Sequence, residues 1–298
     1  MISRITHQSV QQQTLANLQR NLTAMSALQS QLSSGKRVTV ASDDPAVAND
    51  MMRLRGEQAA LSRQQRSTAD ADAWLSTVDN ALAGTSSALR SARDLLVRSG
   101  SGALGPQARE ALATELEGVR DALLDQANTS YLGRQVFAGT SATPAFDRTS
   151  YAYSGVPAGQ DETPEVLRQI SAGSTVRVDS DGAAVFGTGD DSVFKLLDDA
   201  AETLRTGGDA TQHLGALDTR ISAVTTEISA IGARHARVLE AKDAVADAQA
   251  ALKSRLSAVE DVDLAEAILD LQMQEVAYQG ALGATARVLQ PTLLDFLR

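Results

Sequence analysis

Apolar side chains recur at every seventh position across residues 214–259, and this repeat constrains the fold more than any other feature of the chain. The most regular row comprises Leu217, Val224, Ile231, Val238, Val245, Leu252 and Val259. A seven-residue repeat that is kept over many turns is typical of a helix packed in a coiled coil. We therefore expect a single helix of roughly 50 residues, about 75 Å long.

A second row of the same period lies three positions earlier and is less apolar. It comprises Leu214, Ile221, Ile228, His235, Lys242, Gln249 and Leu256. Polar residues at such positions commonly set the register of a coiled coil or lie at its edge. We interpret His235, Lys242 and Gln249 in this way, and not as ligands of a bound group.

Residues 45–98 carry the same period and predict a second long helix. Its row comprises Leu54, Leu61, Thr68, Leu75, Leu82, Leu89 and Leu96. The cluster Ser42-Asp43-Asp44-Pro45 predicts the start of this helix, because short oxygen-bearing side chains accept free amide protons and proline suits a first turn. A glycine-rich stretch follows, and Pro106 opens a third helix, so a helical hairpin is expected.

Both ends of the chain are predicted to be amphipathic helices with a narrow apolar seam. The N-terminal seam comprises Leu15, Leu18, Leu22, Met25 and Leu32, and it stops at Ser33-Ser34-Gly35. The C-terminal seam comprises Ile268, Leu271, Tyr278, Leu282, Leu289 and Phe296, and Pro291 is expected to kink or fray its end. Because isolated helices of this kind are marginal in water, we expect both to be loose in the monomer and to order against other molecules.

Residues 131–191 change character, with dense Gly, Pro, Thr and Ser between short β-prone runs. The runs are 135–137, 151–153, 166–170 and 175–178. Residues 192–204 then return to a helical pattern.

These elements predict a mainly α protein, an elongated helical coiled-coil rod formed by the N- and C-terminal halves, with a small β-rich domain inserted in mid-chain. The rod would comprise residues 45–130 and 192–260, and the β-rich domain residues 131–191. Segment 1–44 would be the N-terminal helix with its loop, and segment 261–298 the C-terminal helix.

Composition excludes several classes of function. The net charge of -10 argues against nucleic acid as a partner, because binding phosphates requires clustered Lys and Arg. There is no Cys, so disulfides and thiolate sites are impossible. No apolar run reaches the roughly 18 residues that span a bilayer, and the first residues lack the apolar core of a Sec signal. Aromatic residues are only 3%, which makes a compact core of large rings unexpected.

Charge is distributed unevenly along the chain. Residues 1–66 hold eight Lys and Arg against four Asp and Glu, whereas residues 257–298 hold two against seven. The two ends are therefore complementary, although exposed ion pairs contribute only about 0–1 kcal/mol each. Such pairing could orient the ends but not hold them.

Potential chemical motifs are better explained structurally. The GxGxxG match at 100–105 follows a helix instead of the strand that a dinucleotide site requires. The three His residues, His7, His213 and His235, lack metal-ligand or triad spacing. Asp43 and Asp44 belong to a helix start. We therefore expect no catalytic residue, no cofactor and no metal.

Four further segments carry a family resemblance. SGKRVTVASDDP at 34–45 resembles the loop after the N-terminal helix of the flagellin family. VRDALLDQANTS at 119–130, GRQVFAG at 133–139 and ATPAF at 142–146 follow in the order seen in the hook-filament junction proteins of that family, the third hook-associated proteins. DVDLAEAILDLQMQEVAYQGAL at 261–282 has a counterpart there too. The resemblance covers residues 1–146 and 209–298 and leaves the β-rich middle unmatched.

This resemblance implies a structural subunit of the bacterial flagellum. Copies of it would form a ring between the first hook-associated protein and the flagellin filament, after export without a Sec signal through the flagellar type III channel with the help of an export chaperone. It further implies an extracellular location, with no nucleic acid or membrane as partner. The terminal helices would pair in the inner wall of the tube, and the middle would project outward. The expected subunit contacts are Leu15, Leu18, Leu22, Met25, Leu32, Ile268, Leu271, Tyr278, Leu282, Leu289 and Phe296.

Three other functions compete with this one. Flagellin itself is the alternative within the family; the run GRQVFAG and the cluster Ser42-Asp43-Asp44-Pro45 favour the junction proteins over it. A membrane-active type III translocator also uses long amphipathic helices, but it needs an apolar span that the sequence lacks. An enzyme is the third alternative, and it would require a ligand bound at the glycine-rich residues 100–105.

Overall fold

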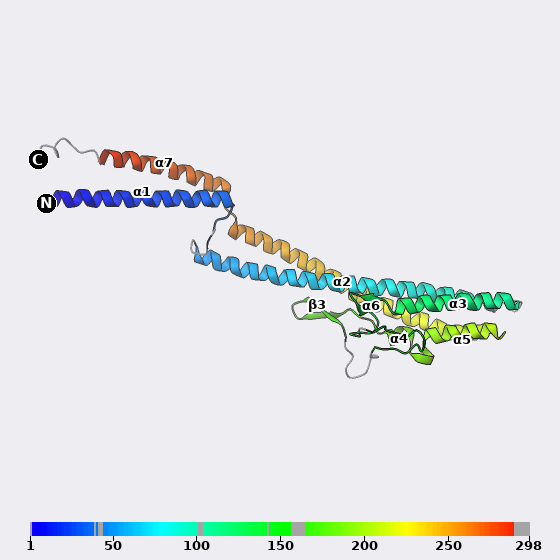
Figure 1. Cartoon of the computed structure of the whole chain (residues 1–298). Helices are drawn as coiled ribbons and strands as arrows, with labels where there is room; N and C mark the ends of the chain where they lie inside the picture. Colours follow the sequence, from blue (N-terminus) through cyan, green and yellow to red (C-terminus); the bar gives the residue numbers. More distant parts are fainter. Residues whose placement is uncertain are drawn as a thin grey trace. The chain divides into compact units, whose positions relative to one another are not determined.

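The computed structural model of the chain describes residues 2–38, 40, 44–100, 104–141, 143–155 and 165–288. The chain packs as two compact units (Figure 1). The first contains Met1–Ala60 and Ala248–Arg298, and the second contains Leu61–Asp247. Two long helices contribute to both units, one from each half of the chain. The expected kink at Pro291 lies outside the described residues.

Seven α-helices, two short 3-10 helices and four strands make up the described part of the chain. The helices are α1 (Ile2–Ser34), α2 (Pro45–Ser99), α3 (Pro106–Ala127), α4 (Gly182–Phe186), α5 (Val193–Arg205), α6 (Leu214–Glu260) and α7 (Leu264–Val288), with η1 (Gly189–Asp191) and η2 (Ala210–His213). The strands are β1 (Ser130–Tyr131), β2 (Arg134–Gln135), β3 (Leu167–Ser171) and β4 (Ser174–Arg177). The mainly α fold with small sheets in mid-chain is therefore confirmed.

The core of the second unit is built on the predicted seven-residue rows. From α2 it takes Leu75, Leu82, Leu89 and Leu96, and from α6 Leu217, Val224, Ile231 and Val238, all at most 1% exposed and all in one core cluster. Two buried Thr residues of α2, Thr68 in this row and Thr85 three positions after Leu82, have no unpaired hydroxyl. Thr85 donates its hydroxyl to the carbonyl of Ala81 at 2.8 Å, which satisfies the buried group. The rows thus pack as the coiled-coil pattern predicts.

The polar members of the second α6 row lie at the edge of this core. His235 Nε2 lies 2.7 Å from Asp72 Oδ1 of α2, and Lys242 Nζ donates to Asp72 Oδ2 at 2.8 Å. Asp72 and His235 are about one-quarter exposed and Lys242 about half. One carboxylate therefore bridges two successive positions of the α6 row and fixes how α2 and α6 are aligned.

The β3–β4 hairpin lies on α2 of the second unit through a set of polar contacts. Gln64 Nε2 donates to the carbonyl of Ile170 at 2.8 Å, and Ser67 Oγ donates to that of Gln169 at 2.7 Å. Arg168 forms an ion pair with Asp70 and stacks over the buried Trp74 ring, 5.4 Å from its centroid. About three turns of α2, from Gln64 to Trp74, thus hold the hairpin in place.

Large rings gather in mid-chain despite the low aromatic content. Four of the five Phe residues meet in one cluster with two Tyr residues: Phe137, Phe146, Phe186, Phe194, Tyr151 and Tyr153. The expectation that rings do not build a core was wrong here, because the few aromatic residues are concentrated between positions 137 and 194. Their rings pack against one another and form the aromatic part of the core.

The Asp72 bridge predicts a pH-dependent contribution to stability. The hydrogen bond from Lys242, followed by that from His235, lowers the pKa of Asp72 below its ordinary value of 3.8. Because the folded pKa lies below the unfolded one, the stabilisation is present above pH 4 and is lost as the pH falls through the folded pKa. We expect Asp72→Asn to lower the free energy of unfolding by about 1 kcal/mol at pH 7.

Urea unfolding at pH 7 and pH 3 checks this prediction. The difference between wild type and Asp72→Asn should shrink at pH 3. Asp79→Asn, at an exposed position of the same helix, is the matched control and should change stability by less than about 0.5 kcal/mol at both values. An equal loss at pH 3 and pH 7 would contradict the role of the charged carboxylate.

Candidate assembly surfaces

In the first unit α1 and α7 pack against each other, and this pairing divides the predicted apolar residues into two groups. Leu18, Met25, Leu32, Leu271 and Tyr278 are half-buried. On each helix these residues are seven positions apart and therefore share one face. That face forms the seam between the two helices.

The other described members of the predicted set lie on outer faces of the same pair. Leu15 is 58% exposed, Leu22 44%, Ile268 47% and Leu282 43%. Leu289 and Phe296 lie outside the residues that the structure describes. On each terminal helix, some of the predicted seam residues therefore face the partner helix and others face solvent.

Further apolar residues of α7 escaped the sequence analysis. Leu264, Leu269, Met273 and Val276 are each more than half exposed. Leu269, Met273 and Val276 follow one another at spacings of four and three, which is the signal that could have revealed a second row. A helix that is apolar on several sides is normally enclosed by other elements, whereas α7 leaves these sides open in the single chain.

The complementary charges of the two ends are not satisfied between α1 and α7. No ion pair joins the two helices among the side chains that the structure describes; Gln274 Nε2 instead donates to the carbonyl of Asn21 at 3.4 Å. Glu266, Asp270 and Glu275 are exposed on α7. These three carboxylates therefore stay available for other surfaces, whereas Glu260 of the same acidic segment pairs with Lys36 and Arg55 of the basic N-terminal segment.

Short main-chain contacts join the loop after α1 to the segment between α6 and α7, within the first unit. The amide of Arg37 donates to the carbonyl of Glu260 at 2.8 Å, and that of Val262 donates to the carbonyl of Gly35 at 3.0 Å. Lys36 and Asp261 form the isolated β-bridge between them. Gly35 has a φ of 69°, so the chain can turn there at no steric cost.

Glu260 is the electrostatic centre of this joint. Its side chain is 8% exposed and forms ion pairs with Lys36 and Arg55, the latter at 3.0 Å. The hydrogen bond from Lys36 lowers the pKa of the Glu260 carboxyl despite its burial. Three segments, the loop after α1, the start of α2 and the end of α6, are thus tied to one carboxylate.

A hollow of about 380 Å³ opens beside the joint. Met51, Met52, Val38, Val40 and Ala48 supply its apolar wall. Met52 is 63% exposed and Val40 55% exposed, so the wall meets solvent. This hollow and the outer faces of the terminal helices together form one set of candidate contacts in the first unit.

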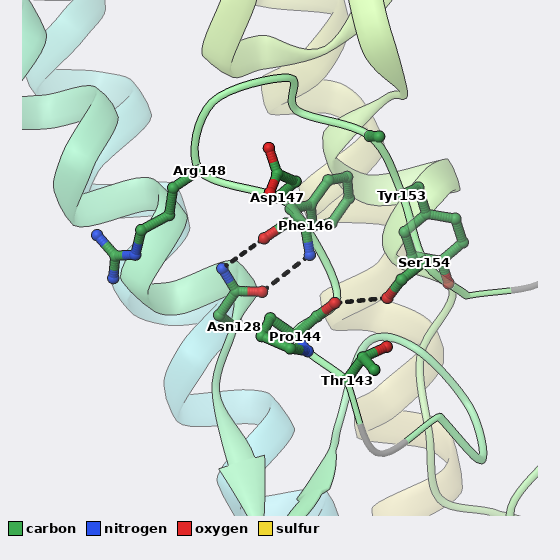
Figure 2. Close-up of a pocket in the computed structure, with 9 residues that line it drawn as sticks. Asn128, Thr143, Pro144, Phe146, Asp147, Arg148, Tyr153 and Ser154 are labelled. Atoms are coloured by element: carbon green, nitrogen blue, oxygen red, sulfur yellow. Dashed lines mark hydrogen bonds between the residues drawn. The ribbon is translucent and has the colours of Figure 1, made fainter.

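A larger hollow of about 710 Å³ lies in the second unit, over the loop 143–154 (Figure 2). Asn128, at the end of α3, holds the loop in place: its Nδ2 donates to the carbonyl of Phe146 at 3.0 Å, and its Oδ1 accepts from the amide of the same residue at 2.9 Å. Tyr153 donates its hydroxyl to the carbonyl of Phe137 at 2.7 Å, and burial raises the pKa of that hydroxyl. Two anchored side chains therefore define the shape of the hollow.

The polar residues considered as chemical candidates have structural partners. Asp44 Oδ1 accepts from the amides of Ala46 and Val47 and caps α2, as predicted. A further acidic residue, Asp181, accepts from the amide of Ala183 and caps α4 in the same way. Of the glycine-rich stretch, residues 101–103 lie outside the described part. Among the described residues no group of three or more acidic or His side chains could hold a metal ion, and no helix is long and apolar enough to cross a bilayer.

Comparison with known proteins decides the family. The sequence model of the bacterial flagellin N-terminal helical region matches residues 5–142, and that of the bacterial flagellin C-terminal helical region matches residues 214–297. The chain belongs to the flagellin family. The resemblance seen in the sequence motifs is confirmed. The two matched regions include α1 from residue 5 onward and all of α7.

Relatives in this family carry two kinds of name. Flagellar hook-associated protein 3 of Salmonella typhimurium is 28% identical over 306 residues, covering 93% of this chain and 94% of that protein. Flagellin of Bacillus subtilis is 27% identical over 311 residues, covering 99% and 100%. Among solved structures, a flagellar hook-associated protein of Vibrio parahaemolyticus (TM-score 0.66, 22% identity) covers 73% of this chain and 99% of that one. Bacillus cereus FlgL (TM-score 0.59, 20% identity) covers 69% and 99%.

The ion pairs of Glu260 are predicted to stabilise the joint. Glu260→Gln keeps the shape of the side chain but removes the charge that both cations share. We expect the free energy of unfolding to fall by about 1 kcal/mol, since Lys36 and Arg55 are half exposed. Amide hydrogen exchange at Arg37 and Val262 should accelerate, because their acceptors lie in the loosened joint.

Glu266→Gln is the control for this prediction, since Glu266 is exposed on α7 and outside the joint. It should change neither the stability nor the exchange of the two amides. Equal effects of both variants would show that the net charge of the region matters and not the ion pairs of Glu260.

Proposed function

We propose that this chain is the hook-filament junction subunit of a bacterial flagellum. In this role copies of the chain form a ring between the first hook-associated protein and the first flagellin layer. The observation that carries the proposal is the pair of terminal helices with apolar outer faces, on a chain similar over nearly its whole length to flagellar hook-associated protein 3 of Salmonella typhimurium. Contact with other subunits would bury the apolar outer faces of these helices.

The exposed apolar residues supply the driving force for assembly. Burying a Leu-sized side chain contributes roughly 1.5–3 kcal/mol. Leu15, Leu22, Ile268 and Leu282 alone therefore offer several kcal/mol to a neighbour that covers them. The unpaired acidic residues of α7 can meet basic N-terminal segments of other copies and orient the contact. Apolar burial holds the layer together, and charge selects its geometry.

The same exposed terminal helices bear on how the chain is exported and when it folds. We propose that the chain leaves the cell unfolded through the flagellar type III channel, accompanied until then by an export chaperone that covers its exposed terminal helices. A chain without Cys has no disulfides to form before or during passage. The terminal helices then order against their neighbours, so assembly and folding of the first unit are coupled. In this role the chain acts as a structural subunit and not as an enzyme.

Deletion of the coding sequence in the parent bacterium tests the function. Cells should carry hooks without filaments and release flagellin into the medium, and the wild-type chain supplied in trans should restore filaments. Normal filaments in the deletion strain would overturn the proposal.

Flagellin is the second candidate, because the Bacillus subtilis flagellin matches the chain end to end. The two functions differ in self-assembly. A flagellin extends itself into long filaments when purified protein is seeded with filament fragments, whereas a junction subunit stops after a layer. Long filaments of the purified chain would favour the flagellin role.

Single charges on the outer faces give a sharper prediction. Leu22→Asp or Leu282→Asp should leave the helical circular dichroism signal of the purified chain unchanged, because both side chains lie outside the α1–α7 seam. The same variants should lose incorporation into flagella, since an unpaired charge would be buried in an apolar contact. Immunodetection in sheared flagella measures incorporation.

Leu22→Met is the matched control, since it keeps an apolar side chain of similar volume at the same position. It should be incorporated like the wild type. If Leu22→Asp were incorporated equally well, the outer face of α1 would not be a subunit contact.

A further inference from the structure

The β1–β2 hairpin of the second unit ends in a strained tip. Its two strands are joined by Leu132 and Gly133, which both have positive φ, 49° and 78°. A two-residue turn of this kind is normally made by Asn-Gly or Asp-Gly. The Cβ of an ordinary residue lies too close to the following carbonyl oxygen in the left-handed region, and Asn and Asp offset this through local hydrogen bonds of their short polar side chains. Leucine therefore stands where the backbone disfavours it.

Burial does not explain the leucine. Its side chain is 81% exposed, the most exposed large apolar residue among those that the structure describes. The other non-glycine residue with positive φ, Tyr151, is 7% exposed and donates its hydroxyl to Asp198 at 2.5 Å. Tyr151 is thus held by its surroundings, whereas Leu132 gains nothing from its own chain. Strain without an internal contact points to an external one.

Arg134 follows the turn and gives the tip a charge. It is exposed, and among the described residues it forms no ion pair. The tip therefore presents one apolar side chain and one free guanidinium, two residues apart on the same hairpin.

The hollow over loop 143–154 has the matching chemistry. Pro144, Ala152 and Tyr153 supply apolar surface above the buried ring of Phe146, and the volume of the open hollow lies in the ~300–1,000 Å³ range of pockets that accept small groups. Asp147 stands at its edge, and the backbone hydrogen bond from Ser150 lowers the pKa of its carboxyl. Only Oδ1 of that carboxylate accepts hydrogen bonds among the described residues, which leaves Oδ2 for a guanidinium.

The tip cannot fill the hollow of its own chain. Leu132 is exposed, and in Figure 2 the chain runs from Asn128 away from the hollow toward the hairpin. We propose that Leu132 at the hairpin tip docks into the 143–154 hollow of a second copy of this chain, with Arg134 paired to Asp147 of that copy.

Tip and hollow are two different surfaces of one unit, so the contact is heterologous. Heterologous contacts repeat from copy to copy and close into a ring or continue as a helix. The inference rests on the proposed function, because a ring of identical subunits needs a contact of this kind. It assigns that contact to the mid-chain segment, in addition to the terminal helices.

The variant Leu132→Asn separates strain from docking. Asparagine tolerates positive φ, so the thermal midpoint of the purified chain should rise by about 2–4 °C. Incorporation into flagella should fall about tenfold or more, because the apolar contact is lost. Leu167→Asn, at a 49% exposed leucine of β3, is the control and should be incorporated like the wild type. A Leu132→Asn chain that is more stable and fully incorporated would overturn the proposal.

Disulfide trapping tests the geometry directly, since the natural chain has no Cys. A chain carrying both Leu132→Cys and Ala152→Cys should give a ladder of cross-linked multimers when sheared flagella are oxidised. Each single variant, and the pair Leu167→Cys with Ala152→Cys, should give no ladder. A cross-linked monomer in the first pair would show that the tip meets its own chain and would refute the proposal.

The outcomes separate the two hypotheses. Chains present in flagella but without a ladder would refute the docking contact and leave the junction function standing. Chains absent from flagella, in cells whose filaments are normal, would refute the junction function; a ladder formed by the concentrated purified pair variant would then support the contact by itself.

Discussion

The packing of the α2 and α6 heptad rows into one core is the interaction on which the second unit depends. With its leucines buried against α6, α2 offers its polar side chains to the β3–β4 hairpin through Gln64 and Ser67. Helix α6 in turn holds the segment after β4, where Arg234 donates to the carbonyl of Asp179 at 3.1 Å. The irregular middle of the chain is therefore positioned by two helices whose alignment the Asp72 bridge fixes, and not by sheet pairing of its own.

The first unit is built differently, and the difference bears on function. Its terminal helices share a seam of half-buried residues, while α7 keeps apolar side chains on several open sides. Such a pair gains most of its stability from whatever covers it. The joint at Glu260 ties the loop after α1, the start of α2 and the end of α6 to one buried carboxylate, so the connections keep their local structure. A subunit whose terminal helices are covered only by its neighbours needs both features: a joint held by ion pairs, and helices with exposed apolar faces.

The polar side chains that could in principle bind a ligand or take part in catalysis instead hold the backbone and the helices in place. Asp44 and Asp181 cap helices, Asn128 fastens the loop at Phe146, and His235 and Lys242 share Asp72. Sequence analysis anticipated the cap at Asp44 and the edge position of His235, because those follow from spacing and local side-chain chemistry. It missed Glu260, whose partner Lys36 lies 224 residues away, and the hollow at 143–154, because both arise from segments brought together by the fold.

The sequence by itself determined the elements with a strong period: α2 begins at Pro45 and α6 runs from Leu214 to Glu260, close to the predicted bounds. Those follow from patterns that repeat within one helix. Which apolar residues of the terminal helices face a partner could not be read the same way, because Leu18 and Leu22 both fit a 3–4 spacing. Only the position of α7 beside α1 half-buried Leu18 and left Leu22 exposed. Likewise, the strain at Leu132 exists only once β1 and β2 pair, since the turn that joins them imposes the positive φ.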